Sequence, residues 1–145
     1  MNPTARRNAR HFALQAMYQW QLSHAPIPEI EEQFITGHLV NKKIDLIYFK
    51  ELIYAIPEQH ATLDDHMISF LSRPIEELDP IELAILRLGV YELACRLDIP
   101  YRVVINEGLE LAKKFGSVEG YKFVNGILDR VARKLRSAEI QSEKK

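Results

Sequence analysis

The stretch Asp79–Cys95 constrains the fold of this chain most, because its side chains are apolar on nearly every side of a helix. A helix that is apolar all round has to be enclosed by other elements. Its start is well marked, since Asp79 can cap the first backbone amides and Pro80 suits the first helical position. Glu82 stands where a capping-box glutamate bonds back to the cap. We therefore predict a buried central helix with an acidic N-terminus.

Polar residues interrupt this central stretch at Glu82, Arg87 and Glu92. We expect them to mark the narrow strips by which the helix reaches solvent or a partner. The only cysteine, Cys95, lies in the same apolar helix and cannot form an internal disulfide. This pattern predicts a buried thiol in a cytoplasmic protein.

The composition is that of one soluble globular domain, with 47% hydrophobic and 27% charged residues in a chain of 145. No apolar run of signal-peptide length follows the early arginines, and charges cut the most apolar stretch, so neither secretion nor membrane insertion is expected. The net charge of -1 argues against a protein that coats nucleic acid indiscriminately. The first ten residues nevertheless hold three arginines and no acid.

Helical periodicity extends along the chain and predicts an all-α, single-domain bundle of about seven helices around the central one. Residues 101–105 alone would suit a strand, but no partner strand is evident. Pro57 lies inside the longest periodic run, and the continuing period favours a kink over a break. The predicted domain covers residues 1–136, and residues 137–145 are expected to form a flexible tail. The expected helices span about residues 3–23, 79–95, 101–115 and 118–136, and the longest periodic stripe runs from residue 46 to residue 70. A short helix is expected between Pro28 and a stop at Gly37, and a short linker helix opens at residues 73–74.

The first predicted helix has two unlike faces. Its apolar face is expected to meet the core and contains Phe12, Ala13, Ala16, Met17 and Trp20. The opposite arc collects Arg7, Arg10, His11, Leu14 and Tyr18, with Arg6 at its edge. Guanidinium groups beside an aromatic ring match what single-stranded RNA requires, namely phosphate contacts and a surface for base stacking. The alternative is an ordinary solvated face with no binding role.

A second candidate surface lies at the start of the last helix. Lys122 adds a cation there beside Glu119, and Phe123 is offset from the apolar stripe of that helix. Phe123 could instead complete the core. The end of the same helix is basic, which suits the helix dipole, and its basic residues are Arg130, Arg133, Lys134 and Arg136.

No pattern in the sequence indicates an enzyme. The glycines form no phosphate-binding loop, and the histidines offer no pair at helical spacing for a metal, so we expect neither a cofactor nor a metal site. His60 falls on the apolar stripe of its helix and is expected to lie at the edge of the core. Neighbouring acids such as Asp64 and Asp65 are expected to form a solvated face.

The sequence resembles the NusB family of bacterial transcription antitermination factors over almost its whole length. The resemblance rests on the segments Ala5–Arg10, Gln15–Trp20, Ile99–Glu107, Glu110–Lys113 and Lys122–Asp129. It implies an all-helical bundle that pairs with a small-subunit ribosomal protein, NusE, and binds the boxA element of nascent RNA. It also implies a role in processive antitermination on ribosomal RNA operons, with RNA polymerase and other Nus factors.

The resemblance also implies roles for individual residues. The arginine-rich start of the family matches Arg6, Arg7 and Arg10; its first-helix aromatic matches Tyr18; and its RNA-facing turn matches Glu119, Lys122 and Phe123. The acidic residue that the family uses toward NusE matches Glu82. Two positions depart from the pattern: Asn8 stands where a third consecutive arginine can occur, and Glu119 replaces a shorter aspartate.

Two other functions remain open from the sequence. The segments around Asn106 and Asn125 also resemble the N-terminal helical domain of ribosomal RNA cytosine methyltransferases, which would require a large catalytic domain after residue 145. The chain could also be a helical adaptor or homodimer without any RNA role. Binding of S-adenosylmethionine would favour the enzyme, and a lack of RNA affinity would favour the adaptor.

Overall fold

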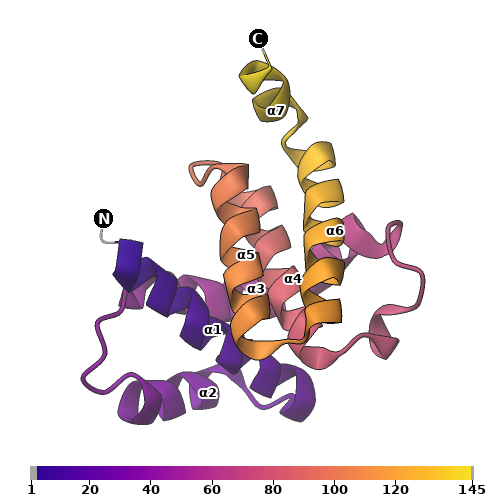
Figure 1. Ribbon diagram of the computed structural model, residues 1–145. Coiled ribbons are helices and arrows are strands. Elements are labelled where there is room, and N and C mark those ends of the chain that lie inside the picture. The colour runs from indigo at the N-terminus through magenta and orange to yellow at the C-terminus, as the bar shows by residue number, and fades with distance from the viewer. Residues whose placement is uncertain (1–2, 145) are drawn as a thin grey trace. The chain divides into compact units, whose positions relative to one another are not determined.

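The computed structural model describes residues 3–144, in which seven α-helices and no strands occur (Figure 1). The all-α prediction is therefore confirmed. A π-helical turn, η1 (Phe34–His38), follows α2, and a short 3-10 helix, η2 (Ile75–Glu77), precedes α4. The helices are α1 (Pro3–Ser23), α2 (Ile27–Gln33), α3 (Leu46–Ile68), α4 (Pro80–Cys95), α5 (Tyr101–Phe115), α6 (Val118–Leu135) and α7 (Ser137–Glu143).

The chain divides into two compact units, and the boundary between His60 and Ala61 falls inside α3. The N-terminal unit contains α1, α2, η1 and most of α3. Its core includes Ala13 and Met17 of α1, as predicted, together with Ile30, Phe34 and Phe49, all at most 2% exposed. The rings of Phe34 and Phe49 lie 5.9 Å apart. These large side chains give the short α2 and η1 a buried face against which to fold.

α3 continues through Pro57 without a break, as the periodicity predicted. Proline removes one backbone donor, so the carbonyl groups near it are open to other partners. His60 Nδ1 lies 2.7 Å from the Pro57 carbonyl oxygen, and its ring meets Trp20 edge-on with the centroids 5.4 Å apart. The prediction of a core-edge histidine is confirmed.

The C-terminal unit is organised around α4, which packs with α5 and α6 (Figure 1). Every residue of α4 from Leu83 to Leu93 is buried, so the prediction of an enclosed central helix is confirmed. The three helices approach closely at Leu128 of α6. A Cβ atom placed on Gly89 of α4 or Gly108 of α5 would lie 2.8 or 2.7 Å from a Leu128 methyl group. The missing side chains at these two glycines thus allow the close contact.

The prediction that Arg87 and Glu92 open strips to solvent is wrong, because they are 7% and 0% exposed. The predicted solvated face at Asp64 is also wrong. The Arg87 guanidinium donates from Nε and Nη2 to the two Asp64 carboxylate oxygens, at 2.9 and 2.8 Å. A bidentate pair of this kind satisfies both charges, so two polar residues can be enclosed in an otherwise apolar unit.

Among the basic residues at the end of α6, Arg136 is buried, with only 4% of its surface exposed. Its guanidinium donates to the backbone carbonyl groups of Glu92, Leu93, Arg96 and Ile99, at 2.9 to 3.1 Å. These carbonyls belong to the last turn of α4 and the connection after it, where helices leave acceptors unsatisfied. Arg136 thus serves as a cap for α4 rather than as a surface cation.

The segment after residue 136 was expected to be a flexible tail, and most of it forms α7. Glu139 accepts from the Arg136 guanidinium at 2.6 Å and from the Tyr101 backbone amide at 3.0 Å. Glu143 accepts from Arg102 at 2.9 Å, which lowers the pKa of the Glu143 carboxyl. Cys95 lies in the last turn of α4 and is exposed, so the prediction of a buried thiol is wrong. The enclosure of α4 ends within this turn, after Leu93.

Candidate nucleic-acid interface

The predicted cationic arc of α1 is only partly accessible. Arg7 is exposed, and Tyr18 is 37% exposed. Arg10 and Leu14 are 4% and 3% exposed, so the prediction that they belong to an open face is wrong. A helical wheel gives directions around one axis, but packing covers α1 over more than the apolar side. The accessible part of the arc therefore begins at Arg7 and ends at Tyr18.

The guanidinium groups of Arg6 and Arg10 are held by Tyr48, a buried residue at the start of α3. Their central carbons lie 4.1 and 5.6 Å from the centre of the Tyr48 ring. Arg6 also faces Asp45, with Nη2 3.7 Å from Oδ2, and its side chain is 14% exposed. Cation–π contacts of this kind hold the charges in place. The sequence analysis missed Tyr48, because its partners are about forty residues away in the chain and no local pattern connects them.

The second candidate surface begins at the N-terminus of α6. Ser117 caps the helix, its hydroxyl accepting from the Gly120 amide at 2.9 Å. Glu119 and Lys122 are exposed in the first turns, and Phe123 is half-buried. Phe123 is therefore neither a core residue nor a fully exposed one, and part of its ring is accessible to a ligand.

Glu82 lies against this same turn of α6. A Cβ atom on Gly120 would lie 2.7 Å from Glu82 Oε2, so the carboxylate rests on the bare backbone at Gly120. Asp79 caps α4 as predicted, accepting from the amides of Ile81 and Glu82 at 3.1 and 3.0 Å. The structure thus places Glu82, predicted to bind a protein, beside the turn that holds Glu119 and Lys122, predicted to bind RNA. Nothing in the sequence indicates that these residues are neighbours.

The environment of Glu82 disfavours its charged form. Partial burial raises the pKa of its carboxyl above the ordinary value, the nearby Asp79 carboxylate adds to the rise, and Arg73 opposes it. A carboxylate in such a setting gains from a partner that offers it a hydrogen-bond donor or a cation.

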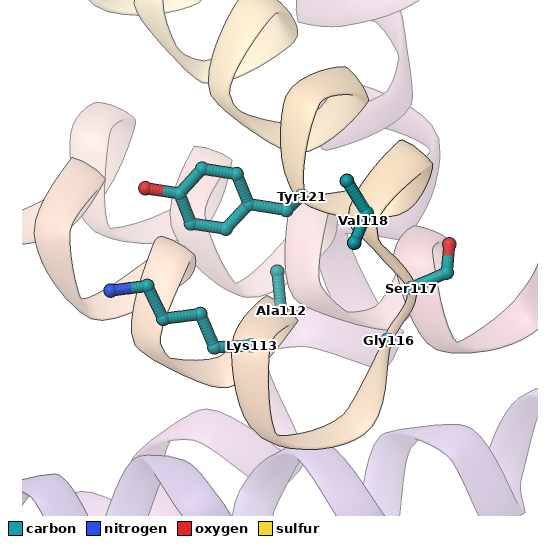
Figure 2. A pocket seen from close by; sticks show the side chains of 6 residues that line it. All are labelled: Ala112, Lys113, Gly116, Ser117, Val118 and Tyr121. Carbon is teal, nitrogen blue, oxygen red and sulfur yellow. The ribbon is translucent and has the colours of Figure 1, made fainter.

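A pocket of about 290 Å³ lies beside this turn, between the end of α5 and the start of α6. Its walls are Ala112, Lys113, Gly116, Ser117, Val118 and Tyr121. Figure 2 shows the Tyr121 ring and the Lys113 side chain extending in the same direction, and Lys113 Nζ lies 5.7 Å from the ring centre. An aromatic ring with a cation nearby can receive a flat, negatively charged group such as a nucleotide.

Two classes of site find no support in the described residues. Between residues 3 and 144 no group of three histidine, cysteine, aspartate or glutamate side chains is placed to hold a metal ion. None of the helices described is long and apolar enough to cross a membrane.

Comparisons with known proteins agree on one family. The model of the NusB family matches residues 7–133. The transcription antitermination protein NusB of Alcanivorax borkumensis is 53% identical over 137 residues, covering 94% of this chain and 91% of the relative. The NusB protein of Marinobacter nauticus is 51% identical over 134 residues, which is 92% of this chain and 84% of the relative. A solved structure of T. maritima NusB is 30% identical, with a TM-score of 0.73 and coverage of 88% of this chain and 89% of that one.

Proposed function

Because the chain belongs to the NusB family, we propose that it is a transcription antitermination factor that binds boxA-type single-stranded RNA together with the ribosomal protein NusE. The observation that carries the RNA part is the accessible edge of α1, where Arg7 and Tyr18 are both exposed. Single-stranded RNA needs cations for its phosphates and aromatic faces for its bases. In this proposal the protein acts within an RNA polymerase complex that contains other Nus factors, in the cytoplasm, and catalyses no reaction.

The three arginines of α1 have different roles in this proposal. Arg7 contacts an RNA phosphate directly. Arg6 and Arg10 are held against Tyr48, and because Arg6 also faces Asp45, we expect them to contribute less than Arg7. Tyr18 offers its exposed ring to an unstacked base. Phosphate contacts position the RNA, and base contacts give whatever sequence preference there is.

The start of α6 supplies a second set of RNA contacts in this proposal. Lys122 binds a phosphate, the open part of the Phe123 ring meets a base, and Glu119 accepts hydrogen bonds from a base edge. Glu82, on the neighbouring turn of α4, is the contact to NusE. The support for this role is its partly buried carboxylate beside Gly120, whose charged form is disfavoured in the free protein.

A test is to titrate labelled boxA RNA with this protein, with and without NusE. Each phosphate contact to single-stranded RNA contributes about -0.7 to the slope of log affinity against log salt, so a few exposed cations give weak binding alone. We expect NusE to tighten binding. Equal affinities with and without it would contradict the cooperative complex.

Substitutions separate the two interfaces. Arg7→Glu should weaken RNA binding and leave the melting temperature unchanged, since this side chain is exposed. A drop in melting temperature would show a structural role instead. Glu82→Lys should abolish NusE association while the circular dichroism spectrum stays helical. An unchanged dissociation constant would remove Glu82 from the interface.

A further inference from the structure

The connection between η1 and α3, here called the lysine segment (residues 39–45), carries two exposed cations, Lys42 and Lys43. It is fixed to the start of α1 at two points. The Asn8 side-chain amide donates to the Lys43 carbonyl at 2.7 Å, and the Asp45 amide donates to the Ala5 carbonyl at 3.0 Å. In Figure 1 this connection rises from η1 and comes close to α1 at the first turn of that helix. The lysines are therefore placed beside the arginine-rich end of that helix.

The backbone of the lysine segment has a defined turn. Leu39 is 8% exposed and anchors its beginning in the core. Asn41 has φ of 63°, a left-handed conformation that asparagine tolerates better than most residues. The Lys42 amide then donates to the Leu39 carbonyl at 3.1 Å. A turn closed in this way presents consecutive side chains at its surface, in this case the two lysines.

The charge of these lysines is not compensated nearby. The acid of the same segment, Asp45, is already engaged, because Oδ1 accepts from the Tyr48 amide at 3.0 Å and Oδ2 faces Arg6. Across residues 3–144, no carboxylate pairs with the ammonium group of Lys42 or Lys43. The neighbouring Lys50 differs, since its Nζ lies 3.7 Å from Glu31. An unpaired cation attracts a polyanion more strongly than a paired one does.

We propose that Lys42 and Lys43 form a further phosphate-binding edge, which carries the RNA backbone from Arg7 across the start of α1 onto the lysine segment. The link to α1 is direct, because Asn8, which anchors Lys43, follows Arg7 in the chain. Lysine binds phosphate as a flexible point charge without reading bases. This edge therefore adds affinity for single-stranded RNA of any sequence. The inference rests on the proposed RNA-binding function.

The test uses the double variant Lys42→Gln/Lys43→Gln with NusE present. Binding of boxA RNA and of an unrelated single strand of equal length is measured across salt concentrations. Loss of two phosphate contacts should reduce the slope of log affinity against log salt by about 1.4. The fold-loss of affinity between about 50 and 200 mM salt should therefore be about seven times smaller in the variant than in the unmodified protein. Both RNAs should change equally. The melting temperature should stay the same, because both side chains are exposed.

The matched control is Lys50→Gln/Arg133→Gln, which removes the same charge from two cations that are each paired with a carboxylate, Glu31 and Asp129. Its salt slope should match that of the unmodified protein. An equal fall in both double variants would mean that net charge alone matters, and would overturn the inference. So would a change confined to boxA RNA, which would indicate base reading.

Arg7→Glu separates this inference from the proposed function. If Arg7→Glu weakens binding and the lysine variant keeps the full salt slope, the lysine segment is not a contact and the proposed function stands. If neither variant alters binding, both the inference and the α1 surface are refuted. If only the lysine variant weakens binding, the edge is supported and the contact assigned to Arg7 is wrong.

Discussion

Substitution of Asp64 by alanine should destabilise this protein more than any change to a surface charge. Asp64 and Arg87 have side chains 12% and 8% exposed and share a bidentate contact at 2.8 and 2.9 Å. Removing the carboxylate leaves the Arg87 guanidinium buried without the Asp64 counter-charge. Breaking a buried pair from one side costs about 3–5 kcal/mol.

The size of the effect can be stated as a melting temperature. With about 2.1 cal/mol/K per residue, unfolding a chain of 145 residues has an entropy of about 0.3 kcal/mol/K. A loss of about 3–5 kcal/mol then lowers the melting temperature by about 10–16 °C. The same loss of unfolding free energy can be measured by urea denaturation monitored by circular dichroism. The midpoint urea concentration should fall, while the slope of free energy against urea stays unchanged.

The double variant Asp64→Leu/Arg87→Met is the control for this reasoning. Replacing both charges by apolar side chains of similar size removes the buried guanidinium together with the carboxylate, so most of the stability should return. The interpretation would be refuted if Asp64→Ala cost less than about 1 kcal/mol, as exposed pairs do. It would also be refuted if the double variant were as unstable as the single one.

Two further predictions concern helix contacts in the C-terminal unit. For Glu82→Gln, the raised pKa means that ionisation costs the folded state more than the unfolded one. This cost is absent below the ordinary pKa of 4.5, where the carboxyl is protonated in both states, and it appears as the pH rises through the folded pKa. The variant should therefore be more stable than the parent protein at pH 7 and equally stable at acidic pH. Equal stability of the two proteins at both pH values would contradict this prediction. Gly89→Ala should cost about 1–3 kcal/mol, because its Cβ would lie 2.8 Å from Leu128. Gly126→Ala, with nothing within 4 Å, is the matched control and should gain about 0.5–1 kcal/mol from helix propensity; similar denaturation midpoints for the two variants would refute the packing explanation.

The candidate site was predictable from the sequence only in part. Four of the predicted site residues are exposed, namely Arg7, Tyr18, Glu119 and Lys122. Arg10 is buried, since Tyr48 approaches from α3 and makes the helix face near Arg10 an interior surface. The periodicity of α1 cannot predict this burial, because a helical wheel describes one helix without the elements that pack against it.

The lysine segment shows the same limit. Lys42 and Lys43 look like ordinary loop residues, and only the bond from Asn8 to the Lys43 carbonyl, across 35 positions, places them beside α1. Glu82 and Gly120 also come together through packing rather than through any motif. At the lysine segment and at the start of α6, the arrangement of the residues thus depends on contacts between positions far apart in the chain.

What the sequence determined by itself is the helical class and the enclosed α4 with its Asp79 cap. For Pro57 the periodicity favoured a continuing helix without settling it, and α3 does continue. These features depend on capping, periodicity and apolar content, which act between residues a few positions apart. The tertiary structure alone decided which charges are buried. Arg87 is enclosed because Asp64 lies opposite it, and Arg136 because it meets the carbonyl groups at the end of α4. A charged side chain is buried at low cost only where partners are supplied. Asp64 is 23 positions from Arg87, and the Glu92 carbonyl is 44 positions from Arg136.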